Sequence, residues 1–146
     1  MRIFFDTNVL IAASVRDHAH HSQALPALQR VISKRDRGFI STHSIAELYA
    51  TFTRLVVSPR IHPVDAARII ADNVLPHFDT IRVDKNDYLT ALALVRDGGW
   101  IGARIYDALL LCCAAKADVD RIYTFDLSHF RALAPSELQR KICSPS

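Results

Sequence analysis

The sequence contains few of the features that mark a membrane, fibrous or linker-rich protein. Only four of its 146 residues are glycine, and no segment is a repeat or a low-complexity tract. The longest apolar run, residues 108–115, is far too short to span a bilayer. The N-terminal segment reaches an acidic residue, Asp6, too early for a secretory signal peptide. Because half of the residues are hydrophobic, we expect one compact domain over residues 1–146, with a real core and no membrane segment.

Cysteines and the usual nucleophilic motifs are also scarce. The three cysteines, Cys112, Cys113 and Cys143, lack the spacing of a metal site, and their odd number argues against a disulfide framework. A reducing, cytoplasmic environment is therefore expected. No Ser/His/Asp or Cys/His arrangement and no glycine-rich phosphate loop is present. The net charge of +3 is compatible with a polyanionic partner without establishing one.

Two groups of basic or titratable residues each have two interpretations. His18, His20 and His21 suggest a metal site, but their spacing matches no standard one, so the solvated start of a helix is favoured. A basic cluster follows near the end of the same predicted helix and consists of Arg30, Lys34, Arg35 and Arg37. Such clusters usually solvate a surface and favour the C-terminus of a helix, and contact with phosphate is the alternative.

Short apolar runs alternate with longer amphipathic segments along the whole chain. Strands are expected at residues 3–5, 38–41, 80–83 and 121–124, with an edge strand over 138–142. Helices are expected at residues 9–15, 18–37, 42–58, 84–97, 104–117 and 126–133, with another beginning near Pro63. Strands that alternate with helices build parallel sheets covered on both faces. The fold class is therefore α/β: a three-layer α/β/α sandwich around a mostly parallel sheet of four to five strands.

Two aspartates stand where a predicted strand gives way to a helix. Asp6 follows the apolar run of residues 3–5, and Asp126 follows residues 122–125. The carboxyl ends of parallel strands are where open α/β sheets place ligands. If the two strands are neighbours, the two acids lie side by side at that edge. The alternative for each is that it caps the helix that follows.

Asp107 is the most informative residue, because it lies in the most apolar helix of the chain. Such a helix is buried on most of its surface, and an ionised carboxylate there is costly unless it is paired, metal-bound or facing a polar cleft. The alternative to a functional role is an ion pair with Arg104, one turn earlier. Glu47 carries less information, since periodicity alone places it on a solvated surface of its helix.

The order of these acids resembles that of the PIN-domain ribonucleases, and among them most closely the VapC-type toxins of toxin–antitoxin pairs. The resemblance rests on an apolar strand ending in Asp6-Thr7-Asn8, a helical Glu47 after residues 41–46, Asp107-Ala108 in an Ala/Leu helix, and Thr124-Phe-Asp126 with Phe130. It covers essentially the whole chain, and the four acids are separated by 41, 60 and 19 residues. One position departs from the pattern, because His129 stands where some relatives carry a further acid.

The resemblance implies a catalytic quartet of Asp6, Glu47, Asp107 and Asp126, with Thr7, Asn8 and Thr124 as supporting or substrate-contacting groups. Four ionised carboxylates cannot share a small space without countercharge, and a hard divalent cation removes this conflict. We expect Mg²⁺ or Mn²⁺ on Asp6, Asp107 and Asp126, with Glu47 holding a metal-bound water or a second ion. The implied reaction is the cleavage of single-stranded or loop RNA. The family also implies a homodimer and a small antitoxin partner.

Two other functions stay open at this point. A PIN-like module that only binds RNA or a protein has the same fold without catalysis. An aspartyl-phosphate phosphatase also begins with a strand followed by Asp, and uses a second Asp two residues later as acid and base. Asn8 occupies that second place here, which argues against the phosphatase.

Overall fold

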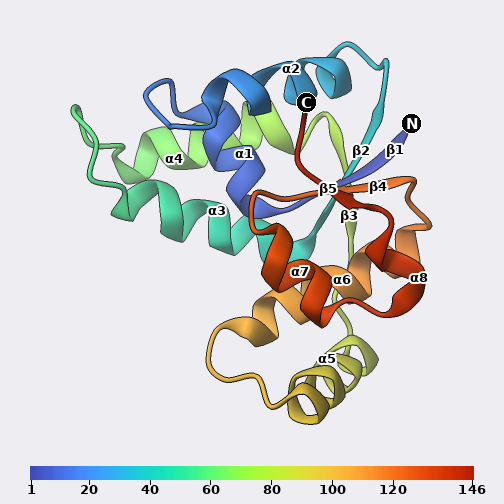
Figure 1. Cartoon of the computed structure of the whole chain (residues 1–146). Helices are drawn as coiled ribbons and strands as arrows, with labels where there is room; N and C mark the ends of the chain where they lie inside the picture. Colours follow the sequence, from blue (N-terminus) through green and yellow to red (C-terminus); the bar gives the residue numbers. More distant parts are fainter.

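A sheet of five parallel strands runs through the middle of the structure, a computed structural model that describes residues 1–146 (Figure 1). The strands are β1 (Arg2–Phe5), β2 (Arg37–Ser41), β3 (Phe78–Ile81), β4 (Arg121–Tyr123) and β5 (Ile142–Cys143). Their order across the sheet is β3-β2-β1-β4-β5, so β1 is central and lies between β2 and β4. The predicted α/β class and parallel sheet are confirmed.

Helices cover both faces of this sheet. On one face pack α1 (Thr7–Ser14), α2 (His21–Ile32), α3 (Thr42–Arg54) and α4 (Pro63–Ile69), which continues into the π-helical turn η1 (Ile70–Val74). On the other face pack α6 (Arg104–Ala117), α7 (Leu127–Leu133) and α8 (Ser136–Gln139). α5 (Lys85–Gly98) lies against α6 at the lower end of Figure 1. This arrangement is the predicted three-layer sandwich.

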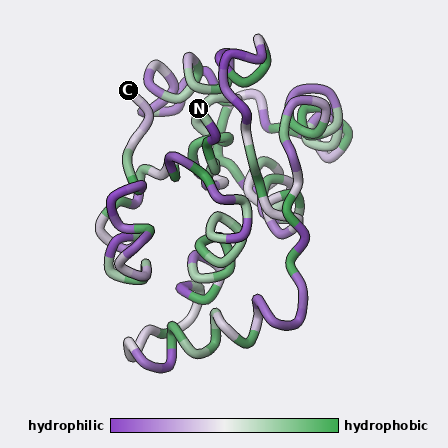
Figure 2. The backbone as a smooth tube through the Cα atoms, turned by 90° about the vertical axis from the view of Figure 1, so that its right-hand side faces the viewer, coloured by the Kyte–Doolittle hydropathy of each residue, from purple (hydrophilic) through white to green (hydrophobic).

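The alternation of side chains along β1 connects the two helical layers. Ile3 and Phe5 belong to the core on the α1 side, and Phe4 belongs to the core on the α6 side. All three side chains are almost completely buried, which explains why this strand is an unbroken apolar run. Figure 2 shows hydrophobic segments gathered in the interior, whereas the outer connections are mainly hydrophilic.

Two of the predicted strands differ from the structure. β3 lies two residues earlier than the predicted segment 80–83, because Phe78 is its inward side chain while Asp79 and Thr80 are exposed. The edge strand predicted over 138–142 is wrong in most of its length. Residues 136–139 form the helix α8, and Leu138 is buried as part of this helix rather than of a strand. Only Ile142 and Cys143 pair with β4.

The predicted helices also change at their ends. α1 begins at Thr7, immediately after Asp6, rather than at residue 9. α2 occupies only His21–Ile32 of the predicted segment 18–37, and the chain then turns through Lys34, whose φ of 59° is left-handed. This turn leads directly into β2 and brings the end of α2 close to the N-terminus of the chain, since the backbone N–H of Arg37 bonds to the carbonyl of Met1.

α5 is the least buried of the long helices. Ala91 faces the core, but Leu89 and Leu92, which the helical spacing predicted as apolar surface, are 53% and 50% exposed. The reason is that α5 packs mainly on α6, with a smaller contact to α7, rather than on the sheet. None of the helices combines the length and the apolarity needed to cross a membrane.

Candidate active site

The two aspartates at the strand ends come together because β1 and β4 are neighbours. Asp6 directly follows β1, and Asp126 lies three residues after β4. The hydroxyl of Thr124 links them: it donates a hydrogen bond to Asp6 Oδ2 at 2.7 Å and accepts one from the backbone N–H of Asp126 at 3.0 Å. A fully buried threonine therefore connects the carboxyl group of Asp6 to the backbone of Asp126, 120 residues later in the sequence.

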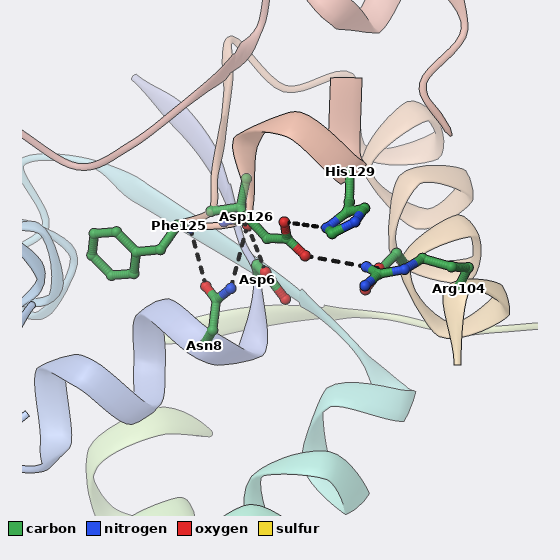
Figure 3. A network of polar contacts seen from close by, with 8 residues as sticks. Asp6, Asn8, Arg104, Phe125, Asp126 and His129 are labelled. Atoms are coloured by element: carbon green, nitrogen blue, oxygen red, sulfur yellow. Dashed lines mark hydrogen bonds and ion pairs between the residues drawn. The ribbon is translucent and has the colours of Figure 1, made fainter. Parts of the chain in front are cut away.

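Asn8, in the first turn of α1, forms hydrogen bonds to the segment that contains Thr124 and Phe125 (Figure 3). Its side-chain nitrogen donates to Thr124 Oγ1 at 3.4 Å, and its side-chain oxygen accepts the backbone N–H of Phe125 at 3.3 Å. Both polar atoms of Asn8 are thus engaged within the protein. These contacts give Asn8 and Thr124 the geometry of supporting residues.

Capping does not explain either aspartate. Asp6 and Asp126 occupy the N-cap positions of α1 and α7, but neither side chain accepts a hydrogen bond from its helix. By contrast, Asp84 does cap α5, through a reciprocal pair of hydrogen bonds with Asp87. The alternative role considered for Asp6 and Asp126, capping of the helix that follows, is therefore not observed.

Asp107 does form the ion pair with Arg104 that the sequence offered as its alternative. Arg104 Nη1 donates to Asp107 Oδ2 at 2.8 Å. The same nitrogen donates to Asp126 Oδ2 at 3.2 Å, a contact that Figure 3 shows. His129 Nδ1 lies 2.6 Å from the other oxygen of Asp126. Arg104 therefore joins two acids of the quartet, which an ordinary one-turn helix pair would not do.

Glu47 reaches the site from α3, which periodicity alone did not predict. The hydroxyl of Thr7 donates to Glu47 Oε2 at 2.6 Å. On the other side, His43 Nε2 lies 2.9 Å from Glu47 Oε1, without the angle of a hydrogen bond. The imidazole of His43 is itself stacked on Tyr106 of α6, with ring centroids 5.0 Å apart. Glu47 is thus held between α1 and α3 and is partly buried.

One pocket of about 340 Å³ at the carboxyl edge of the sheet contains the whole acidic quartet. It is lined by Asp6, Glu47, Asp107 and Asp126, by Thr7 and Asn8, and by Ile11, His18, Thr51 and Leu55. Thr124 is completely buried and does not line this pocket. Sequence reasoning missed Thr51, Ile11 and Leu55, which face the pocket only because α1 and α3 converge there.

Burial dominates the electrostatics of this pocket. Burial raises the pKa of Asp6 from 3.8 to about 7; the hydrogen bond from Thr124 opposes this shift, and the charges of Asp107 and Glu47 add to it. Burial also raises the pKa of Asp107, although Arg104 acts in the opposite direction. Burial therefore makes two carboxyl groups of one pocket resist ionisation, and only Asp107 has a cation beside it.

The chemistry of this donor set fits a hard divalent cation. Mg²⁺ and Mn²⁺ prefer oxygen ligands, and carboxylates supply both the oxygens and the missing charge. As the side chains stand, no three His, Cys, Asp or Glu residues converge into a ready-made metal site. Arg104 accounts for part of this, because it already occupies oxygens of Asp107 and Asp126. A cation would therefore compete with the guanidinium of Arg104 for these two acids.

Comparison with known proteins decides the family. The PIN domain family matches residues 3–134. This chain belongs to the PIN domain family. A comparison with curated proteins gave no match.

Three solved structures show the same PIN fold at low sequence identity. VapC20 from Mycobacterium tuberculosis, described as a toxin that cleaves the sarcin–ricin loop, is 21% identical with a TM-score of 0.68, covering 87% of this chain and 92% of its own. VapBC2 from Rickettsia felis, bound to a promoter DNA fragment, is 15% identical with a TM-score of 0.67 over 100% of both chains. FitAcB from Neisseria gonorrhoeae is 18% identical with a TM-score of 0.69, covering 98% of this chain and 97% of its own. The resemblance inferred from the order of the acids is therefore confirmed for family and fold.

Proposed function

We propose that this PIN-domain protein is a metal-dependent endoribonuclease that cleaves single-stranded or loop RNA and acts as the toxin of a toxin–antitoxin pair. The observation that carries the proposal is the single pocket that Asp6, Glu47, Asp107 and Asp126 line together. The description of VapC20, which has the same fold, as a toxin that cleaves the sarcin–ricin loop supports RNA as the substrate class.

In this proposal Asp6, Asp107 and Asp126 hold Mg²⁺ or Mn²⁺. When bound, such a cation supplies Lewis acidity toward the phosphodiester and lowers the pKa of a coordinated water. Asp6 must give up its proton to act as a ligand, and Thr124 helps by donating to the ionised carboxylate. Glu47, which accepts a hydrogen bond from Thr7, would orient water at the edge of the pocket, and Thr7 would contact the substrate phosphate.

The structure also bears on the phosphatase alternative. That chemistry needs a proton-transferring acid two residues after the nucleophile. Asn8 stands there, carries no acidic proton, and uses both polar atoms in bonds to Thr124 and Phe125. The remaining alternative is a PIN domain that binds RNA or a protein without cleaving.

Cleavage of mixed cellular RNA by the purified protein tests the proposal. Wild type is expected to cut RNA with Mg²⁺ or Mn²⁺ and to stop when EDTA is added, and Asp6→Asn is expected to be inactive. Asp97→Asn is the matched control, because Asp97 is exposed and pairs only with Arg96. Cleavage of the same bonds in EDTA would contradict metal dependence. Absence of cleavage with either metal would favour the non-catalytic alternative.

We propose a small antitoxin and a second copy of this chain as partners, on the basis of the family. An arginine of the antitoxin that enters the acidic pocket would neutralise it and make two parallel hydrogen bonds to one carboxylate. Induced expression of wild type should slow growth, co-expression of the antitoxin should restore it, and Asp6→Asn should not slow it. Equal inhibition by both forms would show that any toxicity is not catalytic.

A further inference from the structure

The edge of the sheet opposite to the acidic pocket carries a second, basic pocket. It has a volume of about 500 Å³ and lies at the amino ends of β1 and β2, beside the turn that follows α2. Its lining, here called the basic edge pocket, consists of Met1, Arg2, Val31, Lys34, Arg35, Asp36, Arg37 and His77. The lengths of β1 and β2, four and five residues, separate this pocket from the acidic quartet. At the usual rise per residue of a strand, this separation is about 15 Å.

The acid within this pocket is already neutralised by the protein itself. Asp36 is buried and accepts hydrogen bonds from Arg30 Nε at 2.6 Å and from the α-amino group of Met1 at 2.9 Å. These contacts hold its pKa below the usual range, chiefly through the hydrogen bond from Arg30. Outside the lining, Asp79 is paired with Arg37, and the carboxylate of Asp120 accepts the backbone N–H of Arg2 at 2.7 Å. The lining of the basic edge pocket therefore carries more positive than negative charge.

Lys34 and Arg35 carry this surplus charge. Both are exposed, and neither forms an ion pair or side-chain hydrogen bond within the protein. Their backbone is nevertheless fixed: the N–H of Lys34 bonds to the carbonyl of Val31, and the N–H of Arg35 bonds to the carbonyl of Arg30. The two cations thus project from a short turn of defined shape.

Arg2 and Arg37 also belong to the lining, and their guanidinium groups pack on Phe39. The guanidinium of Arg2 lies 4.6 Å above the ring of Phe39 and donates to the carbonyls of Ala117 and Asp118 at the end of α6. The guanidinium of Arg37 lies 5.3 Å from the same ring. These contacts hold two arginine planes in place before any ligand arrives.

We propose that the basic edge pocket binds the phosphodiester backbone of RNA, as a second contact remote from the acidic pocket; this rests on RNA being the substrate, as proposed above. Clustered arginine and lysine recognise phosphate, and the lining contains no Trp, Tyr or Phe on which a base could stack. The acidic pocket repels RNA until a cation is bound. The basic edge pocket supplies attraction that needs no metal and no sequence.

Fluorescence anisotropy in EDTA tests the proposal by measuring the binding of a labelled single-stranded RNA. An RNA of about 30 nucleotides is long enough to span several single-strand binding sites. Lys34→Glu combined with Arg35→Glu is expected to weaken binding about tenfold or more, and to lower the slope of log Kd against log salt by roughly 1.4, the value for two phosphate contacts. The matched control is Arg68→Glu with Lys85→Glu, which makes the same change in net charge at exposed residues without ion pairs. It should leave Kd within about twofold.

The outcomes separate this proposal from the proposed function. Equal RNA affinity of wild type and the Lys34/Arg35 variant, at equal thermal midpoints, would overturn the basic edge pocket while cleavage in Mn²⁺ still upheld the nuclease. Loss of RNA affinity in that variant, in a protein that cleaves nothing, would uphold the pocket and refute the nuclease. The neutral variant Lys34→Gln with Arg35→Gln should give an intermediate loss. Binding of polyglutamate but not of RNA would overturn the proposal in favour of an acidic protein partner.

Discussion

Asp6 is the one member of the acidic quartet with no cation or imidazole beside it. Asp107 and Asp126 share Arg104, and Glu47 lies next to His43. The side chain of Asp6 accepts a hydrogen bond from the hydroxyl of Thr124 and is 5% exposed. Its pKa of about 7 follows from this isolation, with burial as the main cause. The charge of this single carboxyl therefore couples folding to pH and to metal.

In metal-free buffer, the stability of wild type is expected to fall as the pH rises from about 4 to about 7. The unfolded chain loses the Asp6 proton near pH 3.8, whereas the folded protein keeps it until about pH 7. The folded state therefore binds more protons in this window, and the free energy of unfolding decreases with pH. The full shift from 3.8 to about 7 corresponds to a loss on the order of 4 kcal/mol as an upper bound.

Urea unfolding at pH 5 and pH 8 in EDTA checks this expectation. Asp6→Asn should lose most of the pH dependence and should exceed wild type in stability at pH 8. Added Mg²⁺ should stabilise wild type at pH 8 and leave Asp6→Asn nearly unchanged. The same pH dependence in both proteins would show that Asp6 is not the titrating group.

Arg104 is expected to compete with metal, because its guanidinium already bridges Asp107 and Asp126. Arg104→Gln should bind Mn²⁺ about tenfold more tightly, a gain of about 1.4 kcal/mol, and should be less stable than wild type in EDTA. Titration calorimetry with Mn²⁺ measures the affinity without any RNA. Arg96→Gln, which removes an exposed pair with Asp97, is the control. Unchanged or weaker Mn²⁺ binding by Arg104→Gln would contradict the competition.

The sequence predicted the site residues whose local surroundings were informative. Asp6 and Asp126 stand at strand ends, and Asp107 is an acid in an apolar helix. Glu47 needed the family resemblance, since its role depends on Thr7 of another helix. The second bond of Arg104 could not be predicted, because Asp126 lies 22 residues away and meets it only through the packing of α6 beside α7.

At the scale of elements, the junction between β4 and α7 determines the geometry of the site. Thr124 connects this junction to β1 and α1 through three bonds of one hydroxyl, to Asp6, Asn8 and the backbone of Asp126. Because the hydroxyl is fully buried, no water can replace these bonds.

Thr124→Val should therefore reduce both stability and activity. Removal of the hydroxyl leaves buried partners without hydrogen bonds, at a cost of about 1–3 kcal/mol. The pKa of Asp6 should rise further, because the bond from Thr124 is what lowers it. Urea unfolding and the RNA assay at several pH values measure these effects. Thr53→Val, whose hydroxyl bonds only to carbonyls of its own helix, is the control and should be almost silent.

The same scale shows why some elements were predicted well and others were not. α6 matches its predicted bounds, since a long apolar helix has a strong periodic signal. β3 and β5 lie at the two edges of the sheet, and a short edge strand buries too little for its pattern to fix its position. An apolar residue such as Leu138 can then be buried whether its segment forms a helix or a strand.

At the scale of the whole molecule, the sheet both separates the charges and connects the cores. The acidic pocket lies at the carboxyl ends of the strands, and the basic edge pocket lies at their amino ends. The two hydrophobic cores lie on opposite faces of β1, whose neighbouring residues Phe4 and Phe5 point to different sides. If the chain is one domain, neither layer can unfold without exposing the sheet that supports the other.

Phe5→Ala tests this coupling across the sheet. The substitution removes a buried ring from the α1 side and should cost about 3–5 kcal/mol. Trp100, the single tryptophan, packs against the core on the opposite side. Its fluorescence and the far-UV circular dichroism should therefore fall together at one lowered urea midpoint, as they should for Phe4→Ala on its own side. Val56→Ala, at a residue that is 91% exposed, should leave the midpoint unchanged. If Trp100 kept its wild-type midpoint in Phe5→Ala while the circular dichroism did not, the two layers would be independent and the single domain over residues 1–146 would be wrong.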